Sequence, residues 1–280
     1  MIVTIVGLGL IGGSMALDLK NRGFANKVIG VDNNINHTNI ALLSKIVDEI
    51  DDLESAVKQS DLIIIATPIN ATKSLLPEIL TQIKGSIKVV TDVGSTKAGI
   101  SEIVKEHPNR KQYVASHPMA GTEFSGPLAA VSRLFDYKNA ILCDLELSSD
   151  FAISLVKQMY ETLNMKMIFM QSEQHDVSAA YVSHMSHISS FVLSLAVLDK
   201  EKNDKNILNL ASGGFASTVR LAKSSAEMWV PIFEQNSEYI LEVIDTYLEK
   251  LTEFKTSITE NNSENLTELI AQANQIQKIL

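Results

Sequence analysis

The sequence contains little cysteine and fewer basic than acidic residues. Cys143 is the single cysteine among 280 residues, so no intrachain disulfide can form, and the six histidines have no set of cysteines to complete a structural zinc site. Lys and Arg number 24 against 33 Asp and Glu, and the formal net charge of −9 is opposite in sign to that of a phosphate-binding surface. We therefore expect a cytoplasmic protein that does not bind nucleic acid.

Charged residues are also absent from two stretches that resemble membrane segments. The apolar stretch at residues 2–17 is not preceded by Lys or Arg, as a secretory signal would require, and four glycines interrupt it. The stretch from Val177 to Leu198 carries no formal charge and is long enough to span a bilayer, but it contains six serines and two histidines. We expect this second stretch to form a buried helix, and we expect no membrane partner.

Short apolar runs alternate with amphipathic segments in the first part of the chain. Hydrophobic residues make up 45% of the sequence and charged residues 20%, which provides enough apolar surface for globular folding. The alternation is typical of a parallel sheet covered by helices. The predicted helices lie at residues 13–21, 71–82, 97–106 and 151–163. The predicted strands lie at residues 2–6, 27–31, 62–66, 88–91, 113–115, 140–143 and 166–170.

After the last predicted strand the apolar spacing becomes helical. Apolar residues recur at steps of three and four from Ile240 to Phe254 and again from Leu266 to Leu280. The sequence therefore predicts an α/β domain at residues 1–170, with a doubly wound and mostly parallel sheet, followed by an all-α domain at residues 171–280. The uncharged helix from Val177 is apolar nearly all round and needs more cover than one small domain provides, so we expect a homodimer formed through the helical domain.

A dinucleotide-binding motif opens the sequence. The first strand runs into Gly7-Leu8-Gly9-Leu10-Ile11-Gly12, a G-x-G-x-x-G motif that precedes a helix. Gly7 permits a tight turn, Gly9 lets the backbone approach a pyrophosphate, and Gly12 lets the helix pack close to the strand. Asp32 follows about 20 residues later, at the end of the next strand, where an acidic residue binds the ribose hydroxyls. This context favours a Rossmann-type cofactor domain over a glycine-rich turn without a ligand.

Asp32 also predicts which dinucleotide is bound. A carboxylate accepts hydrogen bonds from the 2′-hydroxyl of NAD and repels the 2′-phosphate of NADP, and Asn33 and Asn34 provide no arginine for that phosphate. We therefore expect NAD as the cofactor. Two residues just past the strand at 62–66 are expected to form part of the cofactor wall. The expected cofactor-binding residues are Gly7, Gly9, Leu10, Ile11, Gly12, Asp32, Thr67 and Pro68.

Four later segments carry more polar residues than strand ends and helices usually need. They read D-x-G-S-x-K at residues 92–97, S-H-P-M-A-G-T-E at 116–123, S-H-x-x-H at 183–187, and G-G-F with R-x-A-K-S and M-W between 213 and 229. Through these motifs the chain resembles the prephenate dehydrogenase family, including its arogenate-using relatives, over nearly its whole length. The resemblance implies a helical dimerisation domain and an active site between the two domains. It also implies oxidative decarboxylation of prephenate to 4-hydroxyphenylpyruvate with NAD or NADP, in tyrosine biosynthesis.

His117 is the expected proton acceptor. Prephenate loses the proton of its ring 4-hydroxyl while hydride leaves the same carbon, and a neutral imidazole, with an ordinary pKa of about 6.5, suits that step. By resemblance His117 is the catalytic histidine, and Ser95 hydrogen-bonds nearby to position the hydroxyl or the ring. The alternative for His117 is a structural position at a strand end, before Pro118.

The expected substrate-binding residues centre on an arginine. A substrate with two carboxylates needs a fixed cation, and a guanidinium can bind a carboxylate through two parallel hydrogen bonds. Arg220 matches the substrate-binding arginine of the family, although an exposed helical arginine paired with an acidic residue is the alternative. The resemblance also implies that Ser183 and His187, four residues apart on one helical face, contact the substrate together with Thr122. Glu123 is expected to pair with the arginine.

Three alternatives stay open at the level of sequence. A metal site at His184 and His187, with His175 and Asp176, lacks a further ligand at a motif spacing, and we expect no metal. Ala216 stands where the family often has a basic residue after G-G-F, which leaves the choice between prephenate and arogenate open. The Rossmann half alone would also fit another two-domain hydroxyacid or imine reductase, or a protein that senses NAD without catalysis.

Overall fold

One eight-stranded sheet forms the core of the N-terminal part of the molecule. The computed structural model describes residues 1–202 and 206–279. The strands are β1 (Ile2–Val6), β2 (Lys27–Val31), β3 (Glu49–Ile50), β4 (Leu62–Ile65), β5 (Val89–Asp92), β6 (Tyr113–Pro118), β7 (Asn139–Cys143) and β8 (Lys166–Met170). Their order in the sheet is β3-β2-β1-β4-β5-β6-β7-β8. Neighbouring strands are parallel except β6 and β7, which run antiparallel.

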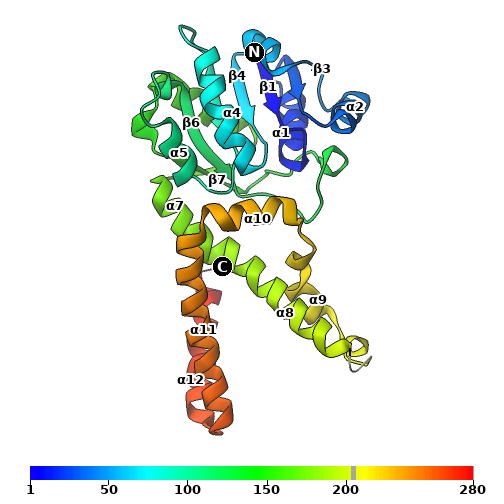
Figure 1. Cartoon of the computed structure of the whole chain (residues 1–280), viewed down its shortest axis with the longest axis vertical. Helices are drawn as coiled ribbons and strands as arrows, with labels where there is room; N and C mark the ends of the chain where they lie inside the picture. The colour runs from blue at the N-terminus through cyan, green and yellow to red at the C-terminus, as the bar shows by residue number, and fades with distance from the viewer. Residues whose placement is uncertain (203–205, 280) are drawn as a thin grey trace.

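Helices cover both faces of this sheet (Figure 1). They are α1 (Leu10–Asn21), α2 (Ile35–Leu43), α3 (Leu53–Gln59), α4 (Ile69–Gln82), α5 (Ala98–Val104) and α6 (Asp150–Thr162). Two separate groups of buried apolar side chains divide the faces, because α1 and α6 pack in one group and α3, α4 and α5 in the other. Successive strand residues such as Leu62 and Ile63 point into different groups. This confirms the predicted α/β fold with a doubly wound, mostly parallel sheet.

Local sequence signals explain where several of these elements begin. The side chains of Asn34, Asp52 and Ser149 accept hydrogen bonds from backbone N–H groups in the first turns of α2, α3 and α6. The strand predicted at 113–115 continues to Pro118, so His117 lies within β6 and not after it. The sequence analysis does not predict α2, β3 or α3, because these elements are short and their apolar residues show no clear period.

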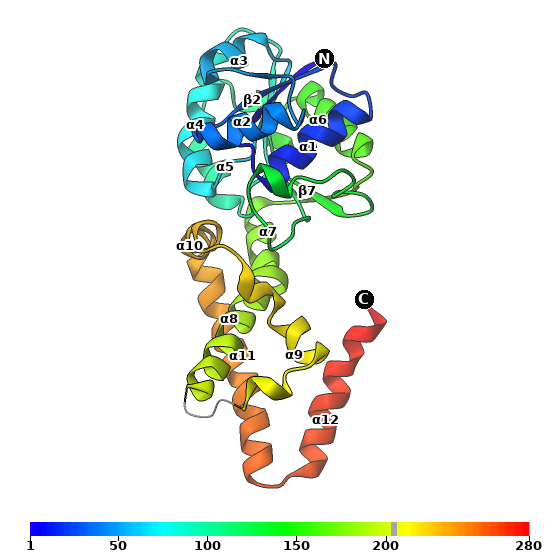
Figure 2. The same cartoon turned by 90° about the vertical axis from the view of Figure 1, so that its right-hand side faces the viewer.

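The C-terminal part of the chain is helical in its described residues and extends away from the sheet as an arm (Figure 2). α7 (Ser172–Ala179), a π-helical turn (Ala180–His184) and α8 (Met185–Glu201) form one continuous helical segment. The chain then passes through α9 (Gly213–Thr218) to α10 (Ala226–Gln235), α11 (Ser237–Thr259) and α12 (Ser263–Ala273). Below α10, the helices α8 and α11 diverge (Figure 1). The predicted all-α second part is confirmed.

The apolar surface of the arm is largely uncovered in one chain. The segment Ser172–Glu201 is long and apolar enough to cross a membrane by length and composition alone, and only 17% of its apolar window is buried. Leu195 and Leu198 on α8, and Leu251 on α11, are more than half exposed. Within one chain this helix is therefore uncovered over much of its surface, because α8 and α11 diverge, in line with the expectation that a single helical domain does not cover it.

Candidate active site

The parallel strands bring predicted site residues to one edge of the sheet. Gly7 follows β1, Thr67 follows β4, Ser95 follows β5, and His117 lies near the end of β6. In open α/β sheets this carboxyl edge is where ligands bind. The first helix of the arm, α7, packs against α5, and α10 packs against α4, so the arm begins next to this edge (Figure 1).

The glycine loop has the shape that a pyrophosphate requires. Gly7 has a φ of +101°, and a Cβ added there would lie 2.5 Å from the carbonyl oxygen of Ala66. A Cβ added at Gly12 would lie 2.0 Å from the carbonyl oxygen of Gly7, so only glycine lets α1 pack on the loop. Gly9 faces open space, with no atom within 4 Å of an added Cβ. The loop is therefore closed toward the protein and open on the side that Gly9 faces.

The N-terminus of α1 offers free donors to an anion. Gly9 is the N-cap of this helix, and no side chain hydrogen-bonds to the N–H groups of its first turn, which includes Leu10 and Ile11. These N–H groups and the helix dipole favour a bound phosphate. The residues present therefore fit the phosphates of a dinucleotide.

Asp32 is fixed beside this loop. Its Oδ2 accepts a hydrogen bond from the backbone N–H of Leu8 at 2.8 Å, and its Oδ1 accepts one from Asn34 at 2.8 Å. The ring of His37, which the sequence analysis did not single out, lies 3.4 Å from Oδ2 through its Nδ1. Each carboxylate oxygen keeps a further lone pair, so Asp32 can still accept a hydrogen bond from a ribose hydroxyl.

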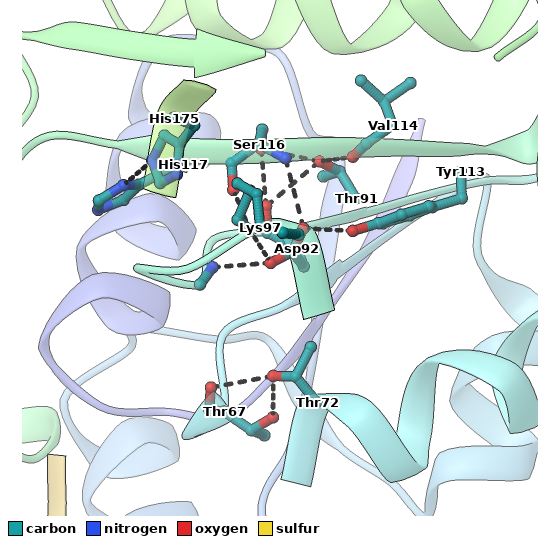
Figure 3. A network of polar contacts seen from close by, with 12 residues as sticks. Thr67, Thr72, Thr91, Asp92, Lys97, Tyr113, Val114, Ser116, His117 and His175 are labelled. Atoms are coloured by element: carbon teal, nitrogen blue, oxygen red, sulfur yellow. Dashed lines mark hydrogen bonds and ion pairs between the residues drawn. The ribbon is translucent and has the colours of Figure 1, made fainter. Parts of the chain in front are cut away.

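Thr67 and Pro68 form the turn between β4 and α4. The hydroxyl of Thr67 lies 3.0 Å from that of Thr72 (Figure 3), and Thr72 also donates to the carbonyl oxygen of Thr67 at 3.1 Å. Pro68 is exposed and is the N-cap of α4. These contacts hold the turn rigidly next to the glycine loop, because Ala66, the residue before Thr67, touches Gly7.

A buried ion pair supports the D-x-G-S-x-K turn. Asp92 and Lys97 are in contact, and both side chains are fully buried. Tyr113 donates its hydroxyl to Asp92 at 2.7 Å, and Lys97 donates to the carbonyl oxygen of Ser116 at 2.8 Å (Figure 3). Burial, followed by the charge of Asp92, raises the pKa of Tyr113 well above its usual range. This network fixes the turn that carries Ser95.

His117 belongs to a chain of buried hydrogen bonds. Its Nδ1 lies 2.8 Å from Nε2 of His175 (Figure 3), and Nδ1 of His175 lies 2.7 Å from Oδ1 of Asp176. His117 is 9% exposed, and the other two residues are 2% exposed. Burial, followed by the neighbouring His175 and the charge of Lys97, holds the pKa of His117 well below its usual value of 6.5. His117 is therefore neutral at physiological pH, and within the described residues its Nε2 has no hydrogen-bond partner and can accept a proton.

The arm contributes a second group of rings. Nδ1 of His187 donates to the carbonyl oxygen of Ser183 at 3.0 Å, and the ring of His187 stacks on Trp229 with centroids 3.6 Å apart. His184 is buried and accepts a hydrogen bond from Asn236 at 3.1 Å, and burial lowers its pKa to about 4. Ser183 and His184 lie in the π-helical turn and His187 lies one turn beyond it, and such a turn is frequent at functional sites. In residues 1–202 and 206–279, no three His, Cys, Asp or Glu side chains are placed to hold a metal ion.

Arg220 is paired with Glu123 at the exposed side of these rings. Its Nη1 lies 3.7 Å from Oε2 of Glu123, with the arginine side chain 54% exposed, which confirms the expected pair. Burial, followed by the positive charge of Arg220, lowers the pKa of His187, so the two side chains are close enough to interact. A half-exposed ion pair contributes little stability, so another carboxylate can replace Glu123 at low cost.

Comparison with known proteins assigns the chain to a family. Residues 15–169 match the model of the prephenate dehydrogenase nucleotide-binding domain, and residues 171–272 match that of the prephenate dehydrogenase dimerization domain. The chain belongs to the prephenate dehydrogenase family. One relative is the prephenate dehydrogenase of Bacillus subtilis (strain 168), which is 33% identical over 94% of this chain and 72% of the relative.

Two solved structures of similar proteins share the whole fold. A prephenate dehydrogenase from A. aeolicus, in complex with hydroxyphenyl propionate and NAD+, matches with a TM-score of 0.86 at 28% identity, covering 100% of this chain and 98% of that one. Synechocystis arogenate dehydrogenase matches with a TM-score of 0.81 at 28% identity, covering 99% of each chain. The chain is thus an oxidoreductase of the prephenate dehydrogenase family, in which similar folds carry both the prephenate and the arogenate name.

The structure places the predicted residues of this prephenate dehydrogenase family member in two groups. His117, Ser95 and the cofactor loop lie at the sheet edge, and Ser183, His187 and Arg220 lie on the arm. Among the described residues Ser95 has no hydrogen-bond partner, and its expected role in positioning the substrate hydroxyl or the ring stays a prediction. Thr122 is exposed, and its hydroxyl accepts a bond from the backbone N–H of Phe124 at 3.3 Å.

Two residues of the site went unrecognised in the sequence. The sequence indicates His175 and Asp176 only as alternative metal ligands, whereas the structure places them directly behind His117. A histidine next to an aspartate, at the start of the helix that follows the last strand, was the available signal. Trp229 was noted only as part of a motif, and the structure makes it the surface on which His187 stacks.

Proposed function

We propose that this protein catalyses the NAD-dependent oxidative decarboxylation of prephenate to 4-hydroxyphenylpyruvate. The observation that carries the proposal is His117, a buried and neutral imidazole whose Nε2 is unpaired among the described residues, at the sheet edge that also carries the glycine loop. Membership of the prephenate dehydrogenase family supports the same activity. So does the fold shared with a relative solved with NAD+ and hydroxyphenyl propionate.

His117 is proposed to remove the proton of the ring 4-hydroxyl. A neutral imidazole within hydrogen-bond reach of a hydroxyl is a general base, and its Nε2 is the nitrogen that is open for this proton. NAD, when bound, takes up the hydride that leaves the carbon bearing this hydroxyl. The bond to the ring carboxylate then breaks, its electron pair enters the ring, and CO₂ leaves as the ring becomes aromatic.

The residues on the arm are proposed to hold the substrate. Arg220 would exchange its partner Glu123 for a substrate carboxylate, and Ser183 and Thr122 would donate hydrogen bonds from their hydroxyls. Nδ1 of His187 already donates a hydrogen bond to a carbonyl oxygen, so its Nε2 is the ring nitrogen that can hydrogen-bond to the substrate. Ser95, whose hydroxyl is unpaired among the described residues, would bond the substrate hydroxyl next to His117.

Cofactor choice, domain division and assembly are part of the same proposal. Asp32, which is followed by Asn33 and Asn34 rather than by an arginine, favours NAD over NADP. The chain divides between β8, which ends at Met170, and α7, which begins at Ser172, giving domains at 1–170 and 171–280.

The uncovered apolar arm pairs with a second copy, and the match to a dimerization domain supports a homodimer. The single cysteine, Cys143, is free and buried, which supports the proposed cytoplasmic location.

A spectrophotometric assay tests the proposal. Purified protein is mixed with prephenate or arogenate and with NAD or NADP, and the absorbance of the reduced nicotinamide is followed. We expect the highest kcat/KM with prephenate and NAD. Higher efficiency with arogenate would transfer the assignment to arogenate dehydrogenation, for which the Synechocystis relative and Ala216 are the supporting observations. No reduction with either substrate would overturn the proposed function.

A further inference from the structure

The hydrogen bond between His117 and His175 can form in two ways, which differ in which of the two rings donates the proton. Nδ1 of His117 and Nε2 of His175 lie 2.8 Å apart, and only one of these nitrogens can carry the proton of the hydrogen bond between them. A neutral imidazole has a single N–H group. If Nδ1 of His117 carries the proton, its Nε2 is bare and can act as a base, and in the opposite arrangement it cannot.

Asp176 determines which arrangement is formed. Its Oδ1 accepts a hydrogen bond from the backbone N–H of Lys97 at 2.7 Å, and its Oδ2 accepts one from Ala98 at 2.9 Å. Because backbone N–H groups only donate, both carboxylate oxygens are acceptors. Oδ1 also lies 2.7 Å from Nδ1 of His175, so this nitrogen carries the proton. An imidazole with one proton, at Nδ1, has a bare Nε2, so in this arrangement Nε2 of His175 accepts the Nδ1 proton of His117 and leaves Nε2 of His117 unprotonated.

We propose that His175, held by Asp176, is a positioning residue that keeps His117 in the tautomer able to accept a proton at Nε2. The inference rests on the proposed function, in which His117 is the base. When the substrate O–H bond breaks and an N–H bond forms at Nε2, His117 becomes an imidazolium. Its Nδ1–H then still donates to His175, so one proton is gained at Nε2 and none is lost from the three residues.

The surroundings of His117 explain why such support is needed. Lys97 and His184 face the same ring from the turn before α5 and from the arm, and no carboxylate contacts it directly among the described residues. Burial also disfavours the imidazolium. A hydrogen bond to Nε2 of His175 stabilises this cation, in the way that a buried acceptor orients and stabilises the histidine of a serine protease triad.

The orientation of His175 is fixed from both parts of the chain. Asp176 is tied to the N-terminal end of α5 through Lys97 and Ala98, and its own carbonyl oxygen accepts a hydrogen bond from Asn236, at the end of α10, at 2.8 Å. His175 is on α7, one residue before Asp176, and both side chains are buried. The ring therefore has little freedom to turn away from His117.

Three variants separate positioning from structural support. His175→Phe keeps a ring but removes the acceptor, and we expect kcat to fall about 10²-fold or more, the usual range for a lost acid–base function, with KM for prephenate and NAD within about threefold. His175→Gln can offer its amide oxygen to Nδ1 of His117, and we expect it to keep kcat within about tenfold of wild type. The ring of His107 forms hydrogen bonds with Thr81 and Asn109, away from the site, so His107→Gln is the matched control and should leave kcat unchanged.

The tautomer itself can be observed without an activity assay. In wild-type protein labelled with ¹⁵N-histidine, two-bond ¹⁵N–¹H spectra should show His117 protonated at Nδ1 and bare at Nε2, with assignment from His117→Asn. Asp176→Ala removes the acceptor that faces Nδ1 of His175, and we expect a share of His117 in this variant to carry its proton at Nε2 instead.

Several results would overturn the inference. These are a wild-type His117 protonated at Nε2, a His175→Phe variant with kcat within about threefold of wild type, or folded Phe and Gln variants that lose kcat equally. If the variants do not fold, the wild-type spectrum decides alone. A wild-type protein that oxidises neither prephenate nor arogenate would refute the proposed function, and the spectrum would still report the tautomer.

Discussion

At the scale of single residues, the site is built from histidines that stay neutral. Burial is the largest cause that lowers the pKa of His117, of His184 and of His187. The charges of Lys97 and Arg220 lie close enough to lower two of these values further. A neutral ring is what the proposed chemistry needs, because a protonated His117 could not take the hydroxyl proton of the substrate.

The low pKa of His117 predicts how turnover depends on pH. As pH falls through 6.5, we expect kcat to stay level, because His117 remains unprotonated in the folded protein. The acid limb of the kcat profile should therefore have an apparent pKa below 6.5. Initial rates at saturating prephenate and NAD, from about pH 8 to about pH 5, test this. An acid limb centred at or above 6.5, in protein that is still folded, would contradict it.

The same pKa shifts also lower the stability of the protein in acid. The kcat profile must therefore be corrected for any protein that unfolds at low pH. Unfolded histidines have a pKa of about 6.5 and bind protons first as pH falls, so the free energy of unfolding declines below that value. For His184 the decline continues to about pH 4, where the folded protein also binds the proton. Thermal unfolding recorded at each pH shows which rates come from folded enzyme.

At the scale of elements, the turn from β1 into α1 contains glycines that are needed for different reasons. Gly12 is needed by the fold, because a Cβ there would lie 2.0 Å from a backbone oxygen. Gly9 is not needed by the fold, because nothing lies within 4 Å of an added Cβ. The space beside Gly9 is therefore explained by a ligand rather than by packing.

Alanine at these two positions should produce opposite results. Gly12→Ala should lower the free energy of unfolding by about 1–3 kcal/mol, the usual cost of overpacking. Gly9→Ala should lower it by no more than about 1 kcal/mol, because nothing crowds the added methyl group and only the preference of an N-cap for glycine over alanine is lost. We expect Gly9→Ala to weaken NAD binding at least about tenfold, since the new methyl group occupies the side that a pyrophosphate approaches. Denaturant unfolding and calorimetric NAD titration measure both effects, and wild-type affinity in Gly9→Ala would refute the placement of the phosphates.

Elements with a strong local pattern were predictable from the sequence, and contacts between distant segments were not. The strands β1, β2 and β8 match the predicted ranges, because an unbroken apolar run or an alternating one leaves few other choices. The π-helical turn was missed, because it adds a residue without changing the apolar pattern. The contact of His117 with His175 joins residues 58 apart, and the packing of α7 against α5 and β7 brings them together.

At the scale of the whole molecule, the two parts of the chain differ in how much they bury. Both groups of core side chains lie in the sheet and its helices, at residues up to 165. On α12 and α8, by contrast, no large apolar side chain is buried. A helical arm of this kind gains its stability from a second surface, because isolated helices are only marginally stable in water.

A charge on the arm should therefore disrupt assembly. Leu195 on α8 is 62% exposed in one chain, and we expect Leu195→Glu to weaken self-association at least about tenfold, since burying a carboxylate is costly. Leu43→Glu, on α2 of the sheet domain and 84% exposed, is the matched control and should assemble like wild type. Sedimentation velocity or mass photometry at micromolar concentration measures both. A monomeric wild type, or a dimeric Leu195→Glu, would exclude the proposed interface.

The continuous segment from α7 to α8 has a consequence for how the protein would respond to its own abundance. One end of this segment carries His175 behind His117, and the other carries the leucines that a second copy would cover. If the two copies separated, the α7–α8 segment that aligns His117 would lose the packing that supports it. The sheet would keep its own core. At low protein concentration each molecule would then turn over more slowly although its sheet domain stayed folded. The total reaction rate would therefore increase more than in proportion to the amount of protein.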